Sequence, residues 1–84
     1  MQKVEMYYRD GCGYCERAEK ILNKKNVSII KYDTELDTKV LDEMMTRSGR
    51  DTVPQIFIGD KHIGGFDDLS ELDMLDELDE LLAD

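Results

Sequence analysis

Two β-type segments with one amphipathic helical segment between them begin this chain, and this order most constrains its fold. Residues 2–8 alternate polar and apolar side chains, which predicts a strand. Residues 12–26 repeat apolar side chains at helical spacing, which predicts a helix, and residues 27–32 are rich in β-forming side chains. Because a helix separates the two strands, the connection is a crossover, and we expect the strands to be parallel.

The second half of the chain predicts a helix, a hairpin and a closing helix. Residues 34–37 supply helix-capping types, and an apolar face then continues to Ser48-Gly49. Residues 55–58 and 61–63 flank Gly59-Asp60, which is typical of an antiparallel hairpin. A single amphipathic helix is expected from Asp67 or Asp68 onward, with its apolar face formed by Leu69, Leu72, Leu75, Leu78 and Leu82. The order βαβαββα predicts an α/β fold, an open mixed sheet with helices on both faces.

Length and composition indicate one domain over residues 1–84, because a chain this short has room for a single core. Apolar residues make up 40% and charged residues 37%, within the globular range. No apolar run approaches the roughly 20 residues that span a bilayer, and Glu5 falls where a signal peptide is apolar. We therefore expect a cytoplasmic protein that does not bind membranes.

Charge is distributed unevenly along the chain, with a net value of −9. All 11 lysines and arginines lie within residues 1–66, whereas residues 67–84 carry nine acids and no base. Nucleic acid is excluded as a partner, because its binding requires clustered basic side chains facing phosphates. The acidic end is interpreted as a solvated helix face, with a docking surface for a basic partner as the alternative.

The two cysteines form one C-x-x-C unit, Cys12-Gly13-Tyr14-Cys15. Such a unit serves either a metal or redox chemistry. A closed zinc site needs about four ligands, and beyond this pair the chain offers only His62 and carboxylates. The sequence therefore favours a redox pair, and no bound metal is expected.

The two cysteines are expected to differ in their chemistry. Cys12 lies at the predicted junction of strand and helix, where free N–H groups and the positive end of the helix dipole favour a thiolate. Arg9 adds a nearby positive charge that favours the same form. Cys15 lies one turn into the helix on its apolar face, so it should be less exposed and protonated. Cys12 is thus the predicted nucleophile, and Cys15 is the predicted resolving thiol, although it also suits a small core position.

Three segments together resemble the glutaredoxin family, which has the thioredoxin fold. They are Cys12-Gly13-Tyr14-Cys15, Thr52-Val53-Pro54 and Gly64-Gly65-Phe66-Asp67-Asp68-Leu69. Their order and spacing match the family over essentially the whole chain. The resemblance implies a four-stranded mixed sheet flanked by three helices. It also implies a glutathione-dependent oxidoreductase that reduces protein disulfides and protein–glutathione mixed disulfides.

The resemblance also implies how glutathione is bound. Pro54 is expected to form a cis peptide bond and to face the active cysteine. The backbone of Val53 is expected to pair with the cysteine of glutathione. The alternative is a trans proline that begins an edge strand. The start of the last helix should hold the γ-glutamyl end, although Asp67 or Asp68 also suits a helix cap. The predicted glutathione-binding residues are Arg9, Tyr14, Thr52, Val53, Pro54, Gly65, Phe66, Asp67 and Asp68.

Two positions depart from the common family pattern. Gly13 stands where most dithiol members have proline, which leaves the active-site loop less rigid. Leu41 stands where relatives often place Gln or Arg to hold glutathione's glycine carboxylate, and Lys39 is a possible substitute.

Glutathione, disulfide-containing proteins and glutathionylated proteins are the expected partners of a monomer. A thioredoxin-like reductant served by a flavoprotein reductase is the nearest rival enzyme, but no Trp stands beside the C-x-x-C unit. A binding function is the other alternative: two subunits would hold a [2Fe–2S] cluster through Cys12 of each and two glutathiones.

Overall fold

The sheet has four strands in the order β2-β1-β3-β4, as described by a computed structural model of all 84 residues. The central strand β1 (Val4–Tyr8) pairs in parallel with β2 (Ile29–Asp33). On its other side β1 pairs antiparallel with β3 (Gln55–Ile58), which forms a hairpin with β4 (Lys61–Gly64). The predicted parallel crossover and the predicted antiparallel hairpin are both confirmed.

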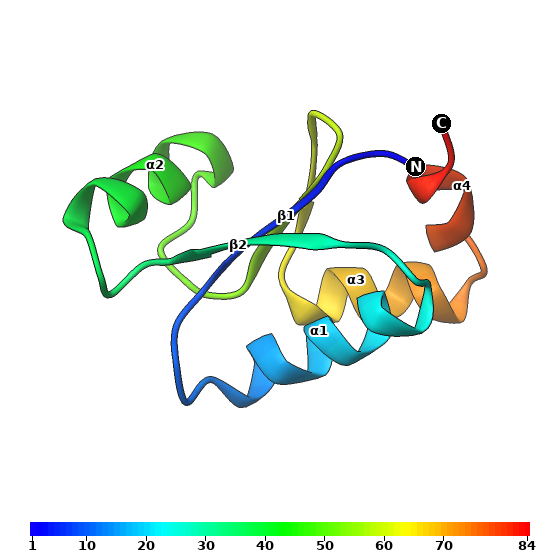
Figure 1. Cartoon of the computed structure of the whole chain (residues 1–84), viewed down its shortest axis with the longest axis horizontal. Helices are drawn as coiled ribbons and strands as arrows, with labels where there is room; N and C mark the ends of the chain where they lie inside the picture. The colour runs from blue at the N-terminus through cyan, green and yellow to red at the C-terminus, as the bar shows by residue number, and fades with distance from the viewer.

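Helices cover both faces of this sheet, with α1 (Gly13–Lys24) and α3 (Phe66–Met74) on one side and α2 (Thr38–Ser48) on the other (Figure 1). The backbone N–H of Lys39 donates to the Asp37 side chain at the start of α2. Gly49 ends α2 with φ +71°, a left-handed conformation that glycine adopts without strain. The predicted α/β class and thioredoxin fold are confirmed by this architecture.

Two apolar clusters fill the space between the sheet and its helices. The larger cluster, under α1 and α3, consists of Val4, Met6, Ala18, Leu22, Ile56, Ile58, Leu69, Leu78 and Leu82. A smaller cluster under α2 consists of Tyr7, Met44 and Phe57. Because both faces are covered, β1 buries Glu5 and Tyr7 as fully as its apolar neighbours.

The single closing helix expected from Asp67 or Asp68 is wrong, because the chain forms two helices there. α3 ends at Met74, Asp76 takes φ +58°, and α4 (Leu78–Leu82) follows. A continuous helix over residues 67–82 would be about 24 Å long, whereas a five-residue strand spans only about 17 Å. The break folds the chain back, so that Leu78 and Leu82 are buried while Leu75 is left exposed.

The acidic end is partly neutralised by Lys25, which directly follows α1. Lys25 lies 3.4 Å from Asp73 and 3.0 Å from Asp79, so it bridges the two C-terminal helices. The other acids of this segment are mostly exposed, as expected for a solvated face. None of the helices combines the length and the apolar character that a membrane span requires.

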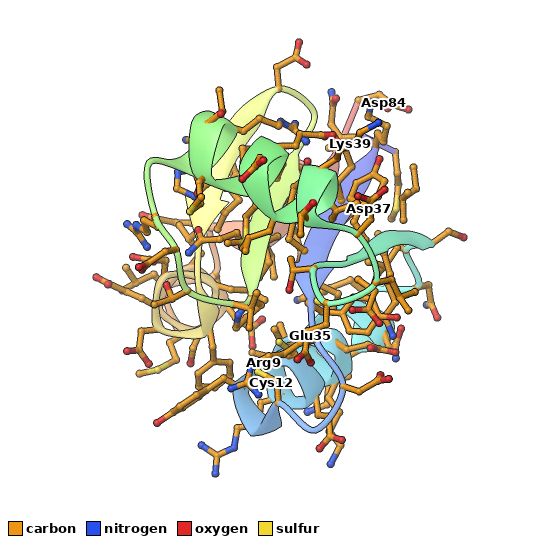
Figure 2. All side chains as sticks on the ribbon, turned by 90° about the vertical axis from the view of Figure 1, so that its left-hand side faces the viewer. Arg9, Cys12, Glu35, Asp37, Lys39 and Asp84 are labelled. Carbon is orange, nitrogen blue, oxygen red and sulfur yellow. The ribbon has the colours of Figure 1, made fainter.

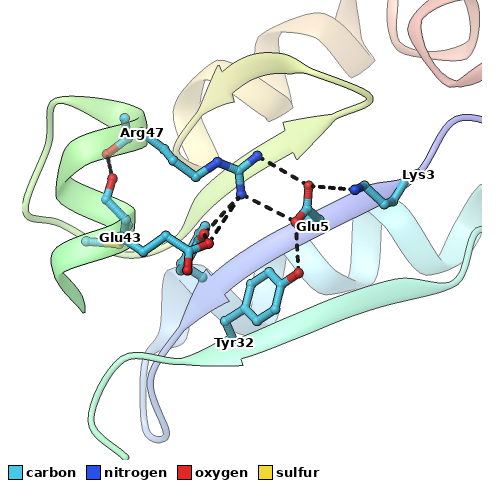
Figure 3. Close-up of polar contacts among 8 residues, drawn as sticks. Lys3, Glu5, Tyr32, Glu43 and Arg47 are labelled. Atoms are coloured by element: carbon cyan, nitrogen blue, oxygen red, sulfur yellow. Dashed lines mark hydrogen bonds and ion pairs between the residues drawn. The ribbon is translucent and has the colours of Figure 1, made fainter. Parts of the chain in front are cut away.

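A polar network ties α2 to the sheet around Glu5, whose side chain is only 7% exposed (Figure 3). Arg47 contacts both Glu5 oxygens at 3.3 Å, and the Tyr32 hydroxyl donates to Glu5 at 2.8 Å. Tyr7 donates to Glu43 and accepts from Arg47 at 3.0 Å. Burial by itself raises the pKa of Glu5, but the hydrogen bonds from Arg47 and Tyr32 and the charge of Arg47 bring it below the ordinary value.

Candidate functional site

Cys12 caps the first helix and points its sulfur at the loop before β3. Its Sγ accepts a hydrogen bond from the backbone N–H of Cys15 at 3.2 Å. The same atom lies 3.9 Å from the carbonyl oxygen of Val53. Gly11, with φ +74°, turns the chain between β1 and α1. The predicted position of Cys12 at a helix N-terminus is therefore confirmed.

Cys15 lies one turn further along α1 and is buried within it. Burial, followed by the neighbouring Cys12 sulfur, raises the pKa of Cys15 to about 12 against a lowering contribution from Arg9. Cys15 is thus a protonated thiol at neutral pH, as expected. It is less exposed than Cys12 only by a narrow margin, 3% against 5%, because the loop before β3 also covers Cys12.

A groove of about 370 Å³ runs from the active-site turn to the start of α3. It is lined by Tyr14, Arg50, Thr52, Val53, Pro54, Gly65, Phe66, Asp67 and Asp68. Eight of the nine predicted glutathione-binding residues lie here, although they come from three separate segments of the sequence. The Val53–Pro54 peptide bond is cis, so the alternative of a trans proline is wrong.

At the start of α3, Asp68 is the third helical residue and caps the helix by a capping box with Gly65, the N-cap residue. Its Oδ2 accepts from the backbone N–H of Gly65 at 2.9 Å and from Arg50 Nη1 at 3.0 Å. The Gly65 N–H, followed by Arg50, holds the pKa of Asp68 below its ordinary value. The capping alternative is thus correct for Asp68, whereas Asp67 is exposed at the groove.

Arg50 is a groove residue that the sequence did not indicate. No local pattern marks it, because its partner Asp68 lies 18 residues further along the chain. Gly64 is equally important to the geometry here: it has φ +120°, and a Cβ atom at this position would lie 2.2 Å from Asp68 Oδ2. Only glycine leaves room for the capping carboxylate.

Arg9 lies outside the first groove and lines a second one, also of about 370 Å³. The residues around this second groove are Arg9, Thr34, Glu35, Leu41, Asp51, Thr52 and Val53. The two grooves meet at Thr52 and Val53. Lys39, suggested as a substitute for a cation at Leu41, lines neither groove, and it lies far from Arg9 and Cys12 in Figure 2.

Aromatic side chains form the rim of the first groove. The rings of Tyr14 and Phe66 lie 5.9 Å apart, and the guanidinium of Arg17 lies 5.7 Å and 6.0 Å from their centroids. Tyr14 remains 58% exposed, so this rim offers a flat apolar contact beside the groove. Tyr14 and Phe66, from separate segments of the sequence, are thus brought together at the rim.

The structure contains no group of three or more His, Cys, Asp or Glu side chains placed to hold a metal ion. Both cysteines are free thiols. The site therefore consists of two thiols, one at the start of α1 and one buried a turn further along it, beside two grooves with charged walls.

Comparisons with known proteins agree with these features. Residues 4–63 match the family described as Glutaredoxin. Glutaredoxin 3 of Escherichia coli (strain K12) is 48% identical over 82 residues, covering 98% of this chain and 99% of that protein. The solution structure of a Brucella melitensis glutaredoxin superposes with a TM-score of 0.86 at 45% identity, covering 98% of this chain and 89% of the other. A buckwheat glutaredoxin–glutathione complex superposes with a TM-score of 0.87 at 26% identity, covering 96% of this chain and 76% of the other.

Proposed function

Because this chain belongs to the glutaredoxin family, and is thus a glutathione-dependent thiol oxidoreductase, we propose that it reduces protein disulfides and protein–glutathione mixed disulfides through Cys12. The observation that carries this proposal is the position of Cys12 Sγ. It is held by a helix N-terminal N–H at 3.2 Å and lies 3.9 Å from Val53 O, where the two grooves meet.

Removal of glutathione from a protein needs only Cys12. The Cys12 thiolate attacks the glutathionyl sulfur, the disulfide bond breaks, and the protein leaves as a thiolate that takes up a proton. The thiolate of a second glutathione then attacks the same sulfur. Oxidised glutathione leaves, and the Cys12 thiolate is restored.

Reduction of a protein disulfide needs Cys15 as well. Attack by Cys12 leaves a mixed disulfide between Cys12 and the substrate. Cys15 then loses its proton and attacks Cys12, which releases the reduced substrate and leaves a Cys12–Cys15 disulfide. Two glutathiones reduce that disulfide and leave as oxidised glutathione. The buried, protonated state of Cys15 keeps it from competing with Cys12 in the first attack.

The charges around the grooves suit the two ends of glutathione. Asp67 supplies a carboxylate for the γ-glutamyl ammonium, since it is exposed and lacks the partners that occupy Asp68. Arg50 and the backbone N–H groups at the start of α3 suit the γ-glutamyl carboxylate. Arg9, in the second groove beside Leu41, is assigned to the glycine carboxylate. The backbone of Val53 lies between these ends and pairs with the cysteine of glutathione.

The test compares Cys12→Ser and Cys15→Ser in two assays: deglutathionylation of a protein and reduction of an intramolecular protein disulfide. Cys12→Ser should abolish both activities. Cys15→Ser should keep deglutathionylation but slow disulfide reduction and trap an adduct visible by non-reducing mass spectrometry. Loss of deglutathionylation in a folded Cys15→Ser protein, or its survival in Cys12→Ser, would overturn the assignment.

The [2Fe–2S] alternative stays a prediction, because one chain supplies only Cys12 toward the four thiolates that such a cluster requires. Anaerobic reconstitution with iron, sulfide and glutathione, followed by a visible spectrum, tests it. The rival thioredoxin-like function is tested by replacing glutathione with a flavoprotein reductase. The cytoplasmic, single-domain and monomeric states likewise stay predictions.

A further inference from the structure

We propose that Gln55 is a positioning residue that aims the backbone N–H of Val53 into the groove, and that His62 anchors Gln55 for this task. The inference rests on the proposed function, in which that N–H pairs with the cysteine of glutathione. It concerns a buried side chain that touches neither Cys12 nor the grooves.

Gln55 is completely buried, and every polar atom of its side chain has a partner. Its Nε2 donates to the carbonyl oxygen of Thr52 at 3.0 Å and to the Thr52 hydroxyl at 3.2 Å. Its Oε1 lies 2.8 Å from Nε2 of His62. A side-chain amide thus bridges strand β4 to the loop before β3.

The direction of each bond in this chain follows from chemistry. A carbonyl oxygen only accepts, so the amide nitrogen of Gln55 must be the atom that faces Thr52. The amide oxygen therefore faces His62, and His62 Nε2 must carry the proton that it donates. His62 packs over Phe57 with ring centroids 4.9 Å apart, which holds its ring in place. Gln55 is consequently held at both ends and cannot turn over without losing its bond to the Thr52 carbonyl.

The orientation of one peptide unit links Gln55 to the site. In a trans peptide the C=O of one residue and the N–H of the next point in opposite directions in one plane. The C=O of Thr52 points inward to the buried amide of Gln55, so the N–H of Val53 points away from it. That N–H donates to no other group of the protein, and Val53 lines both grooves. An unpaired donor is therefore presented where a peptide ligand would lie.

The test compares two disulfides as oxidants of reduced Cys12. Oxidised glutathione has a backbone to pair with Val53, whereas dithiodipyridine has none. Gln55→Met removes the amide at nearly constant volume and should slow the reaction with oxidised glutathione about tenfold, the range expected for a lost hydrogen-bonded positioning group. The rate with dithiodipyridine should stay within about twofold of the wild type. Gln2→Met, the same substitution at an exposed glutamine of the N-terminal segment, serves as the matched control and should change neither rate.

Two more variants keep the test decisive if Gln55→Met does not fold, as judged by circular dichroism. Gln55→Glu keeps the size and the partner His62 but presents an acceptor to the Thr52 carbonyl, so it should show the same selective loss. His62→Phe leaves the bond to Thr52 and should show a smaller selective loss. Equal losses with both disulfides, or no loss in any folded variant, would overturn the role of Gln55. If reduced wild-type protein reacted with oxidised glutathione no faster than a free thiol does, the proposed function would fail instead.

Discussion

The ion pair between buried Glu5 and half-buried Arg47 allows the sharpest stability prediction, because the structure shows what remains when Arg47 is removed. Arg47→Met keeps most of the side-chain volume beside Phe57, over which the guanidinium now lies at 3.9 Å. The Glu5 carboxylate, 7% exposed, then keeps only the Tyr32 hydroxyl at 2.8 Å and Lys3 at 3.7 Å.

Removing one partner of a buried pair costs about 3–5 kcal/mol. The two remaining contacts of Glu5 place this case at the lower end, so we expect the free energy of unfolding to fall by about 3 kcal/mol. For a chain of this length that loss corresponds to a decrease in Tm of about 15 °C. Urea unfolding followed by circular dichroism measures the former, and calorimetry measures the latter.

A double variant separates the lost pair from lost packing. Glu5→Met together with Arg47→Met leaves no buried charge, and an apolar replacement of a buried pair is often neutral. The double variant should therefore return to within about 1 kcal/mol of the wild-type stability. Two results would refute the role of the ion pair. One is a loss of unfolding free energy below about 1 kcal/mol for Arg47→Met alone. The other is a double variant that loses as much stability as the two single changes together.

Acidification gives an independent check on the same pair. The pKa of Glu5 lies below its ordinary value of 4.5 in the folded wild type, so the stability it contributes is present above pH 4.5 and is lost as the pH falls through the folded pKa. In Arg47→Met burial raises that pKa, so protonation relieves the penalty as the pH falls. The stability difference between the two proteins should thus narrow from pH 7 toward pH 4.

Three further outcomes are expected. Asp67→Ala should raise the KM for glutathione with little change in Tm, whereas Asp68→Ala should lower the free energy of unfolding by about 1 kcal/mol, because the Gly65 N–H loses its acceptor. Because the pKa of Asp68 is lowered from 3.8, this stability difference should shrink as the pH falls below 3.8; equal KM changes without any Tm difference would contradict the separate roles of the two residues. Gly64→Ala should lower the free energy of unfolding, measured in urea, by about 2 kcal/mol or more, because φ is +120° and the new Cβ would lie 2.2 Å from Asp68 Oδ2. An unchanged free energy of unfolding would contradict this close approach. Iodoacetamide at pH 7 should modify one thiol per chain rapidly. The alkylation rate of Cys15 should still be rising above pH 10, since burial raises its pKa to about 12. If this rate reached a plateau near pH 9, Cys15 would not be buried.

The local order of the chain was determined by the sequence alone. The strand period of residues 2–8, the hairpin around Gly59 and the helix start at Cys12 all appear in the structure within a few residues of their expected places. These features depend on interactions within one turn or one strand pair, which short-range patterns record directly. The gathering of eight predicted binding residues in one groove follows from the same motifs once the fold is recognised.

Only the tertiary structure decided what depends on contacts between distant segments. The leucine pattern was continuous through Leu75, yet the helix breaks there because Leu78 and Leu82 must return to the core. Arg50 enters the groove through Asp68, and Gln55 holds Thr52 through a bond anchored on β4. In sequence each of these residues is an ordinary polar or apolar position. The role of each is set by a partner brought near by the sheet, because burial and hydrogen-bond geometry arise only when the whole chain has packed.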